Sequence, residues 1–205
     1  MDPDGLALLG GAFDPPHRTH RRIAEAALLQ LPIAELRVVP AGDHPHKLAA
    51  GMAPGNHRLA MCQHNFAGLA GVVVDDREIR RAGRSFTVDT LQELHDARPQ
   101  RRLFFVIGAD NLPLLPTWRD HHRILQLCTV LTFPRADHPI TPQILRGLDF
   151  SPQEQEQLLR NRLILPADGV SATAIRAALC AGARDLPDLL PTVEHYLRQH
   201  HLYGT

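Results

Sequence analysis

Short apolar runs that alternate with longer amphipathic stretches constrain the fold of this chain most strongly. The run Leu103–Gly108 (LFFVIG) contains no polar side chain, which indicates a strand covered on both faces. Before it, Thr87–Ala97 has apolar residues at three-residue steps, which is typical of a helix. We predict further strands at Leu6–Gly10, Leu36–Pro40, within Val72–Ile79, at Thr129–Phe133 and at Leu163–Leu165, and further helices at Ile23–Leu31, His57–Phe66, Pro152–Asn161, Ser171–Ala181 and Thr192–His200.

This alternation predicts an α/β fold, namely a doubly wound, mostly parallel sheet with helices on both faces. The length suits a single domain over residues 1–205, with a C-terminal helical part from about residue 170. Ligands of such folds bind at the carboxyl ends of the strands, near the point where the strand order reverses. The residues just after each strand are therefore the candidates for function.

Charge and cysteine content exclude several classes of protein. Lys plus Arg and Asp plus Glu are both 22, which argues against a general nucleic-acid binder but allows small phosphorylated ligands. No apolar run approaches the roughly 18 residues of a membrane span, and we expect no membrane partner. The 3 cysteines form no CxxC pair, so reduced thiols in a cytoplasm fit best. A homo-oligomer is compatible with the sequence.

The segment after the first predicted strand, GGAFDPPHRTH, has the residues of an anion site. Gly10 and Gly11 let a ligand approach the backbone closely. Asp14–Pro15 predicts a helix start, and His17 and His20 would then share a face near its positive end. Two alternatives stay open: surface histidines in a chain that has 13, or a zinc site, although HxxH lacks an adjacent Glu and a clear third ligand.

Three later segments also follow predicted strands or open predicted helices. Lys47, the single lysine, lies after the second strand, where a flexible ammonium suits phosphate. Asp110 ends the most buried strand, where it can accept ribose hydroxyls or cap a helix. Ser171 can cap the helix that contains Arg176, so that its amides and the guanidinium face one anion.

Two further features are candidates for contact with a ligand. Ser85 and Thr87 open a predicted helix whose amides either bind a carboxylate or are capped in the ordinary way. Trp118 is the single tryptophan and follows Pro113 and Pro116, which make a continuous helix unfavourable. We therefore expect Trp118 in a loop over the ligand edge of the sheet, with a core position as the alternative.

Several of these segments resemble known nucleotidyltransferases. Gly10–His20 resembles the superfamily motif G-[GT]-[FT]-D-P-x-H-x-G-H, with departures at Ala12 and at Thr19, whose side chain is expected near a phosphate. From its ordered motifs the chain is identified as a member of the nicotinate-nucleotide adenylyltransferases. The other motifs are HPHK at 44–47, NHRLAM at 56–61, RAGRSFTVDTL at 81–91, FFVIGAD at 104–110 followed by Trp118, and VSATAIR at 170–176.

The resemblance implies a Rossmann-like fold and transfer of the adenylyl group of ATP to nicotinate mononucleotide in NAD biosynthesis. The sequence has no G-x-S-x-G nucleophile, which favours direct in-line attack, and Mg²⁺ is expected to arrive with ATP rather than at a protein metal site. The implied roles are catalysis by His17, His20 and Lys47, ATP binding by Gly10, Gly11, Phe13, Gly108, Asp110, Ser171 and Arg176, and nicotinate mononucleotide binding by Ser85, Phe86, Thr87 and Trp118.

Other functions remain as alternatives at this point. Phosphopantetheine adenylyltransferases share the HxGH motif and a late S-x-T-x-x-R, but they lack the GAD…W stretch. A cytidylyltransferase is a further alternative within the superfamily. From other classes, the chain could bind NAD precursors without turnover, or it could be a metal-dependent hydrolase that uses HxxH.

Overall fold

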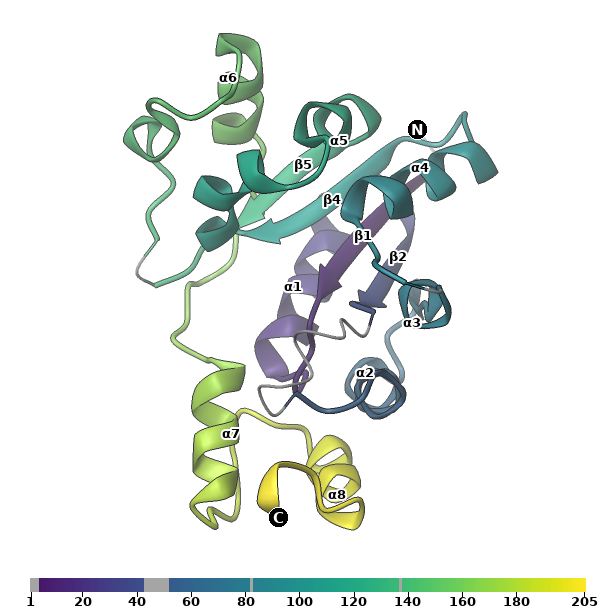
Figure 1. Ribbon diagram of the computed structural model, residues 1–205, viewed down its shortest axis with the longest axis vertical. Helices are drawn as coiled ribbons and strands as arrows, with labels where there is room; N and C mark the ends of the chain where they lie inside the picture. The colour runs from purple at the N-terminus through teal and green to yellow at the C-terminus, as the bar shows by residue number, and fades with distance from the viewer. Residues whose placement is uncertain (1–3, 43–51, 82, 137) are drawn as a thin grey trace.

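The fold is built on one sheet of five parallel strands (Figure 1). The computed structural model describes residues 4–42, 52–81, 83–136 and 138–205. The predicted doubly wound sheet is confirmed, and its strand order is β3-β2-β1-β4-β5. The strands are β1 (Gly5–Gly11), β2 (Ile33–Pro40), β3 (Val72–Val74), β4 (Leu103–Gly108) and β5 (Thr129–Phe133).

Helices follow most of the strands and continue beyond the sheet. The α-helices of the described ranges are α1 (Arg18–Gln30), α2 (Gly55–Phe66), α3 (Arg77–Arg80), α4 (Thr87–Ala97), α5 (His121–Leu127), α6 (Pro152–Arg160), α7 (Ala172–Cys180) and α8 (Pro191–Gln199). Short 3₁₀ helices are η2 (Ala109–Thr117), η3 (Pro142–Leu145) and η4 (Leu202–Gly204).

Strand β1 shows how the two faces of the sheet are covered. Its side chains alternate, because successive residues of a strand point to opposite faces. Leu6 and Leu8 pack in a core cluster with Leu91 of α4, whereas Ala7 and Leu9 pack in another with residues of α1. Figure 1 accordingly shows α4 in front of the sheet and α1 behind it. The chain thus buries both faces, as the apolar strands indicated.

The last helices form a smaller third cluster below the sheet. Met61 of α2 packs there with Ile175 of α7 and with Val193 and Leu197 of α8. Figure 1 shows α7 and α8 at the end of the molecule opposite α5 and α6. The C-terminal helical part begins at Ala172 and is anchored through α2.

Two expectations about local structure were wrong. Asp14–Pro15 does not begin a helix, because α1 begins at Arg18 and Asp14 is buried, accepting a hydrogen bond from the backbone N–H of Ala53 over 2.9 Å. Leu163–Leu165 is not a strand: the segment pairs with β5 only through an isolated bridge between Arg162 and Thr132, and the side chain of Gln30 binds both backbone groups of Ile164, each over 2.8 Å. The third strand, in turn, ends at Val74.

Several short helices of the structure were not expected, among them η2 and α5. The prolines Pro113 and Pro116 lie inside η2, because a 3₁₀ helix accepts the φ that proline fixes. Trp118 follows η2 directly in extended conformation and is partly buried against the core cluster that contains Leu6 and Leu8. Helix α5 has only 7 residues, too few to show a clear helical period in the sequence.

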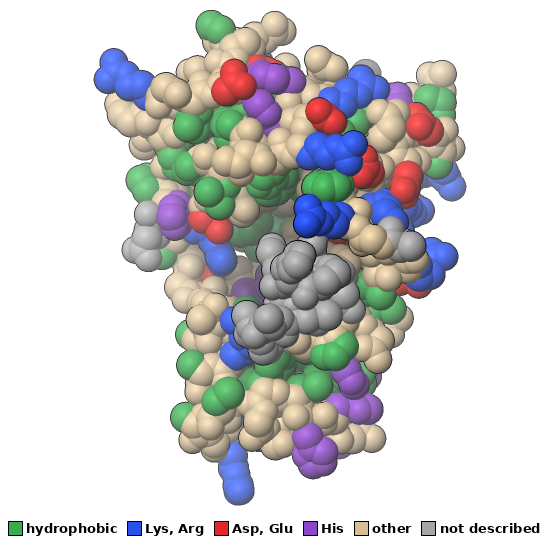
Figure 2. Space-filling view, in the orientation of Figure 1, with side chains coloured by type: hydrophobic (Ala, Val, Ile, Leu, Met, Phe, Trp, Pro, Cys, Tyr) green, Lys and Arg blue, Asp and Glu red, His purple; other side chains and the backbone are tan. Residues whose placement is uncertain are grey.

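The described part of the chain contains neither a long apolar helix nor, on the face that Figure 2 shows, a large patch of one charge. Figure 2 shows Arg side chains interspersed with Asp and Glu over the described part of the visible face. None of the helices in the described ranges is long and apolar enough to cross a bilayer.

Candidate active site

The candidate site lies where the strand order reverses. Strand β1 is paired with β2 on one side and with β4 on the other, so the loops that leave β1 and β4 diverge. The loop after β1 leads to His17, and the turn after β4 contains Asp110. This is the edge at which doubly wound folds bind ligands.

His17 and His20 form a stacked pair at the beginning of α1. His17 is the N-cap residue of the helix, and its backbone N–H donates a hydrogen bond to Nδ1 of His20 over 3.1 Å. Their ring centroids are 3.8 Å apart. Because Nδ1 of His20 is an acceptor, the neutral ring has its proton on Nε2, where it can donate to a ligand.

Both imidazoles are held neutral by their surroundings. Burial, aided by the charge of Arg135 and opposed by that of Asp168, lowers the pKa of His17 to about 4. Burial, followed by repulsion from His17 and Arg135, holds the pKa of His20 well below its usual value. Nδ1 of His17 is buried without a hydrogen-bond partner among the described residues. The pair is therefore a set of neutral polar groups that a ligand can satisfy.

The side chain of Phe13 packs against one member of this histidine pair. Its side chain is only 2% exposed and packs edge-on against the ring of His20, with centroids 4.9 Å apart. A Cβ on Gly11 would lie 3.3 Å from the Phe13 ring, so glycine makes room for it, whereas Gly10 has space for a Cβ. The ring of Phe13 thus positions His20. Because the ring is buried, the expected contact of Phe13 with ATP would have to be made by its main chain.

A pocket beside the pair gathers residues from three loops. Its volume is about 190 Å³, less than the roughly 300 Å³ or more of a complete small-molecule site, so it holds part of a ligand. A Cβ on Gly108 would collide with the carboxylate of Asp110, so glycine allows that side chain its position. The lining residues are Asp110, Arg135, Ala136, His138, Asp168, Gly169, Val170 and Ser171.

Arg135 is a site residue that the sequence reasoning missed. Its Nε lies 3.6 Å from Oδ1 of Asp110, and its Nη1 donates to the backbone oxygen of Val170 over 3.4 Å. Its charge contributes to the lowered pKa of both histidines. Arg135 comes two residues after β5, so inspecting the residues after each strand could have found it.

The sequence reasoning also missed Asp168, which accepts a hydrogen bond from Thr19. The Thr19 hydroxyl donates to Oδ2 of Asp168 over 2.7 Å, and Arg22 donates to the same oxygen over 3.0 Å. Thr19 is 6% exposed, so the departure from the glycine of the motif adds a buried contact that holds the pocket wall.

Ser171 and Arg176 lie on the same helix but have different neighbours. Ser171 caps α7, because its Oγ accepts from the backbone N–H of Ala174 over 3.4 Å, and it lines the pocket. Arg176 instead donates to the backbone oxygen of Asp14 over 2.6 Å, and its Nη1 lies 3.5 Å from Oδ2 of the same residue. Tyr203 donates to Oδ1 of Asp14 over 2.6 Å. Arg176 thus fixes the loop after β1.

A buried arginine, Arg58, connects the loops of the site. Its side chain is fully buried and donates to the backbone oxygens of Ala53 over 2.9 Å, Ala12 over 2.9 Å and Ala41 over 2.7 Å. Ala41 and Ala53 flank residues 43–51, which include Lys47 and lie outside the described residues. The sequence could have indicated this role, because Arg58 lies on the buried face of helix α2, where a charged side chain needs partners.

The residues expected to bind the pyridine nucleotide lie around the start of α4. Phe86 is the N-cap residue and Thr87 the first helical residue, so amides there have no intrahelical acceptor. The Ser85 hydroxyl donates to the backbone oxygen of Glu78 over 3.3 Å. Phe86 and Trp118 are partly buried against the same core cluster, and the Trp118 ring lies 6.0 Å from that of Phe105.

The zinc alternative for HxxH receives no support in the described part of the chain. Among those residues, one group of three or more His, Cys, Asp or Glu side chains has donor atoms close enough to hold an ion. It consists of His121, His122 and Asp149 and includes neither His17 nor His20.

Known proteins match the chain along almost its whole length. The family described as Cytidylyltransferase-like matches residues 8–178. A protein of Albidiferax ferrireducens, named a probable nicotinate-nucleotide adenylyltransferase, is 41% identical over 200 residues, with 98% of each chain covered. A protein of the same name from Listeria monocytogenes is 32% identical over 199 residues, with 97% of each covered. The chain belongs to the nicotinate-nucleotide adenylyltransferase family. It is therefore a nucleotidyltransferase enzyme, and the resemblance of its motifs is confirmed.

Solved structures agree on the fold. Nicotinic acid mononucleotide adenylyltransferase of Plasmodium falciparum, solved in complex with NaAD, aligns with a TM-score of 0.78 at 18% identity, covering 98% of this chain and 97% of that chain. A putative nicotinate-nucleotide adenylyltransferase of Vibrio parahaemolyticus aligns with a TM-score of 0.69 at 20% identity, covering 98% and 96%. The Rossmann-like fold expected for the family is thus confirmed.

Proposed function

We propose that the chain transfers the adenylyl group of ATP to nicotinate mononucleotide by direct in-line attack, as a step of NAD biosynthesis. A phosphate oxygen of the mononucleotide forms a bond to the α-phosphorus of ATP, and the bond from that phosphorus to the oxygen that bridges to the β-phosphate breaks. Pyrophosphate leaves with the electron pair, and nicotinate adenine dinucleotide remains. No proton needs to be transferred in this balance.

The state of the cysteines supports a route without a covalent intermediate. Cys62 and Cys128 are buried, and burial raises the pKa of both thiols, so neither supplies a thiolate nucleophile. Cys180 is exposed, but it donates to the backbone oxygen of Tyr203 and does not line the pocket. In the pocket, the Ser171 hydroxyl accepts a helix-capping hydrogen bond, and no basic partner activates it among the described residues. Catalysis then consists of positioning the phosphates and neutralising their developing charge.

The observation that carries the proposal is the pair of buried, neutral imidazoles at the start of α1. His20 presents Nε2–H as a donor of fixed tautomer, and His17 has a buried nitrogen without a partner in the described residues. Such preorganised donors stabilise charge on the transferring phosphoryl group without reorganisation. Arg135 adds a guanidinium beside them, and amides at the start of α7 add further anion donors.

The carboxylates of the pocket are suitable for Mg²⁺ that arrives bound to ATP. Oδ1 of Asp110 is buried without a hydrogen-bond partner among the described residues, and Asp168 is a second carboxylate of the pocket. Hard oxygen ligands of this kind, together with phosphate oxygens and water, suit Mg²⁺. When bound, the ion supplies positive charge to the triphosphate.

Recognition of the pyridine is assigned to the start of α4 and to Trp118. The indole offers a flat surface for stacking, which is indifferent to an acid or an amide on the ring. Backbone N–H groups at Ser85–Thr87 would donate to a carboxylate but would gain less from a carboxamide. We therefore propose a preference for nicotinate over nicotinamide mononucleotide.

Lys47 remains the proposed phosphate contact within residues 43–51.

A substrate panel tests the function. The protein is incubated with ATP and Mg²⁺ and with nicotinate mononucleotide, nicotinamide mononucleotide or phosphopantetheine, and pyrophosphate release is measured. The expected result is fastest release with nicotinate mononucleotide. Faster release with phosphopantetheine would overturn the assigned acceptor. Binding of nicotinate mononucleotide without release would instead show a binding protein without turnover.

A further inference from the structure

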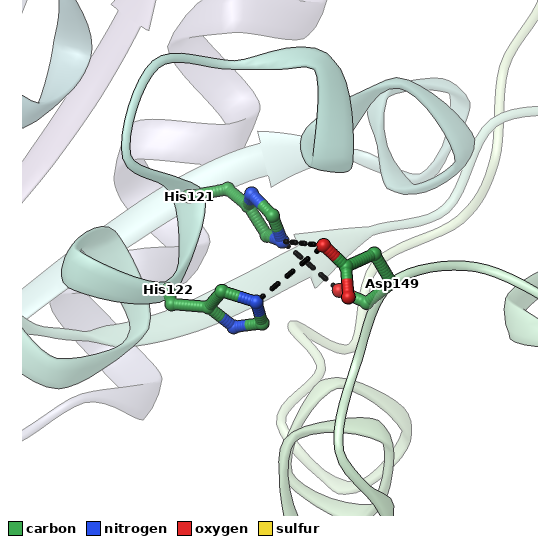
Figure 3. A group of neighbouring side chains, drawn as sticks. All are labelled: His121, His122 and Asp149. Carbon is green, nitrogen blue, oxygen red and sulfur yellow. Dashed lines mark hydrogen bonds and ion pairs between the residues drawn. The ribbon is translucent and has the colours of Figure 1, made fainter.

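A cluster of two histidines and an aspartate lies apart from the pocket, between the start of α5 and the loop before α6 (Figure 3). Nε2 of His121 and Nε2 of His122 each lie 3.6 Å from the same oxygen, Oδ2 of Asp149. The three donor atoms are all within 4.8 Å of one another. Figure 3 shows both rings turned toward the carboxylate.

These spacings are close to those of ligands around one small cation. Zinc binds imidazole nitrogen and carboxylate oxygen at about 2.0–2.2 Å, so ligand atoms at tetrahedral corners lie about 3.4 Å apart. The two measured distances to Oδ2 of Asp149 are 3.6 Å. Small rotations of the side chains would therefore place the three ligand atoms at three corners of a tetrahedron around one cation, and a water molecule can take the fourth corner.

His122 is oriented for this role by a carboxylate behind it. Its Nδ1 lies 2.8 Å from Oε1 of Glu154, and the other oxygen of Glu154 accepts from the backbone N–H of Ser151 over 2.8 Å. Glu154 is thereby fixed in the capping box of α6. With the proton on Nδ1, the lone pair of Nε2 faces Asp149, which is the usual arrangement behind a metal-bound histidine.

His121 is the buried member of the cluster. It is 8% exposed and packs edge-on against Phe150, with ring centroids 5.7 Å apart. Its Nε2 donates to the backbone oxygen of Asp149 over 2.9 Å. A cation must displace this hydrogen bond and shift the proton to Nδ1, which weakens binding compared with a preformed site.

We propose that His121, His122 and Asp149 bind one transition-metal cation of the zinc class, with water completing the coordination. Imidazole with a carboxylate favours such cations over Mg²⁺, which demands oxygen ligands. The cation would join α5 to the segment that leads into α6. Because His121 follows Trp118 by only three positions in the chain, an occupied site would also restrain the segment proposed to contact the pyridine ring.

Cobalt(II) titration of the full chain, stripped with EDTA, tests the site, because four-coordinate cobalt absorbs visibly. We expect one bound equivalent, displaced by zinc and unaffected by excess Mg²⁺ with ATP. His122→Ala and Asp149→Asn remove ligands and should each weaken binding more than 10-fold. Glu154→Gln retains the ligands and should weaken it about 10-fold.

Matched controls separate this cluster from the other histidines. His64→Ala removes an exposed histidine of α2, and His20→Ala removes one of the active-site pair; neither should change cobalt affinity. Asp149 is a largely exposed loop residue, so its variant should fold even where His122→Ala does not. No binding, equal competition by Mg²⁺, or unchanged affinity in both ligand variants would each overturn the proposal. So would a loss of affinity in either control.

Discussion

The hydroxyl of Thr19 donates a hydrogen bond to Asp168 over 2.7 Å and so ties the first helix to the wall of the pocket. The two residues are 149 positions apart in the chain. Because Arg22 shares the same oxygen, α1 has two donors on one carboxylate. The side chain that departs from the family motif is thus a structural contact of the site.

Thr19→Val should test that contact at nearly constant volume. We expect a loss of about 1–2 kcal/mol in the free energy of unfolding, because a buried hydrogen bond to a charged group is removed. KM for ATP should rise because Asp168 loses a restraint. Chemical denaturation and steady-state kinetics measure the two effects. Thr19→Ser retains the hydroxyl and should behave like the parent; equal effects of Ser and Val would count against the hydrogen bond.

His20→Asn should lower turnover by more than about 100-fold, the effect of removing one preorganised donor to transition-state charge. Circular dichroism should stay unchanged, because the amide can occupy the space over Phe13. Pyrophosphate release under saturating substrates measures the loss. Near-normal turnover in a folded variant would remove His20 from the mechanism.

His17 should make stability fall in mild acid. Its folded-state pKa is about 4, against an ordinary value of 6.5, so between these pH values the unfolded chain binds a proton that the folded chain does not. Stability should therefore decrease as the pH drops through this window, by about 3 kcal/mol. Urea denaturation from pH 7 to pH 4.5 should show a shallower decrease in His17→Gln. The exposed control His64→Gln should leave the profile unchanged, and a parallel profile in His17→Gln would contradict the assignment.

Arg58→Met should destabilise the protein by about 3 kcal/mol or more, because the backbone oxygens of Ala12, Ala41 and Ala53 lose a donor whose side chain is fully buried. Arg58→Lys retains the charge, but a single ammonium cannot reach three separate oxygens, so it should recover only part of the loss. Thermal unfolding compares the two variants. Full recovery by lysine would show that the charge, rather than the three-way contact, is what matters.

Trp118→Ala should raise KM for nicotinate mononucleotide about 10-fold, with little change in KM for ATP. Trp118→Phe retains a stacking ring and should lose less. Because Trp118 is the single tryptophan, binding of nicotinate mononucleotide should also quench the intrinsic fluorescence of the parent. Unchanged fluorescence together with an unchanged KM in the alanine variant would make Trp118 a packing residue.

The sequence predicted the sheet well because its strands are buried on both faces. Leu103–Gly108 and Thr129–Phe133 have the predicted bounds, because both are short runs of mostly apolar and β-branched residues that are buried in the sheet. The predicted strand at Leu163–Leu165 is as apolar, but the segment makes only an isolated bridge to β5, and a glutamine from α1 binds the backbone of Ile164. Contacts of this kind between distant residues leave no local trace in the sequence.

The site was predictable only where a motif marked it. His17, His20, Asp110 and Ser171 are gathered at one edge of the sheet because each lies next to a strand or helix end. Arg58 and Asp168 act through contacts that cross 46 and 149 positions of the chain, and such pairings depend on tertiary packing. The helix start at Asp14 failed for a similar reason, because Ala53 and Tyr203 bind its carboxylate.

The bond from Tyr203 to Asp14 also sets an order of events during synthesis. The strands of the sheet can pair as soon as residue 133 has left the ribosome, whereas the loop that precedes His17 acquires its last partner only with residue 203. Domains begin to fold while the chain is still growing. A nascent chain should therefore contain the sheet before it contains a finished catalytic loop, and it should become active only after Tyr203 has left the ribosome.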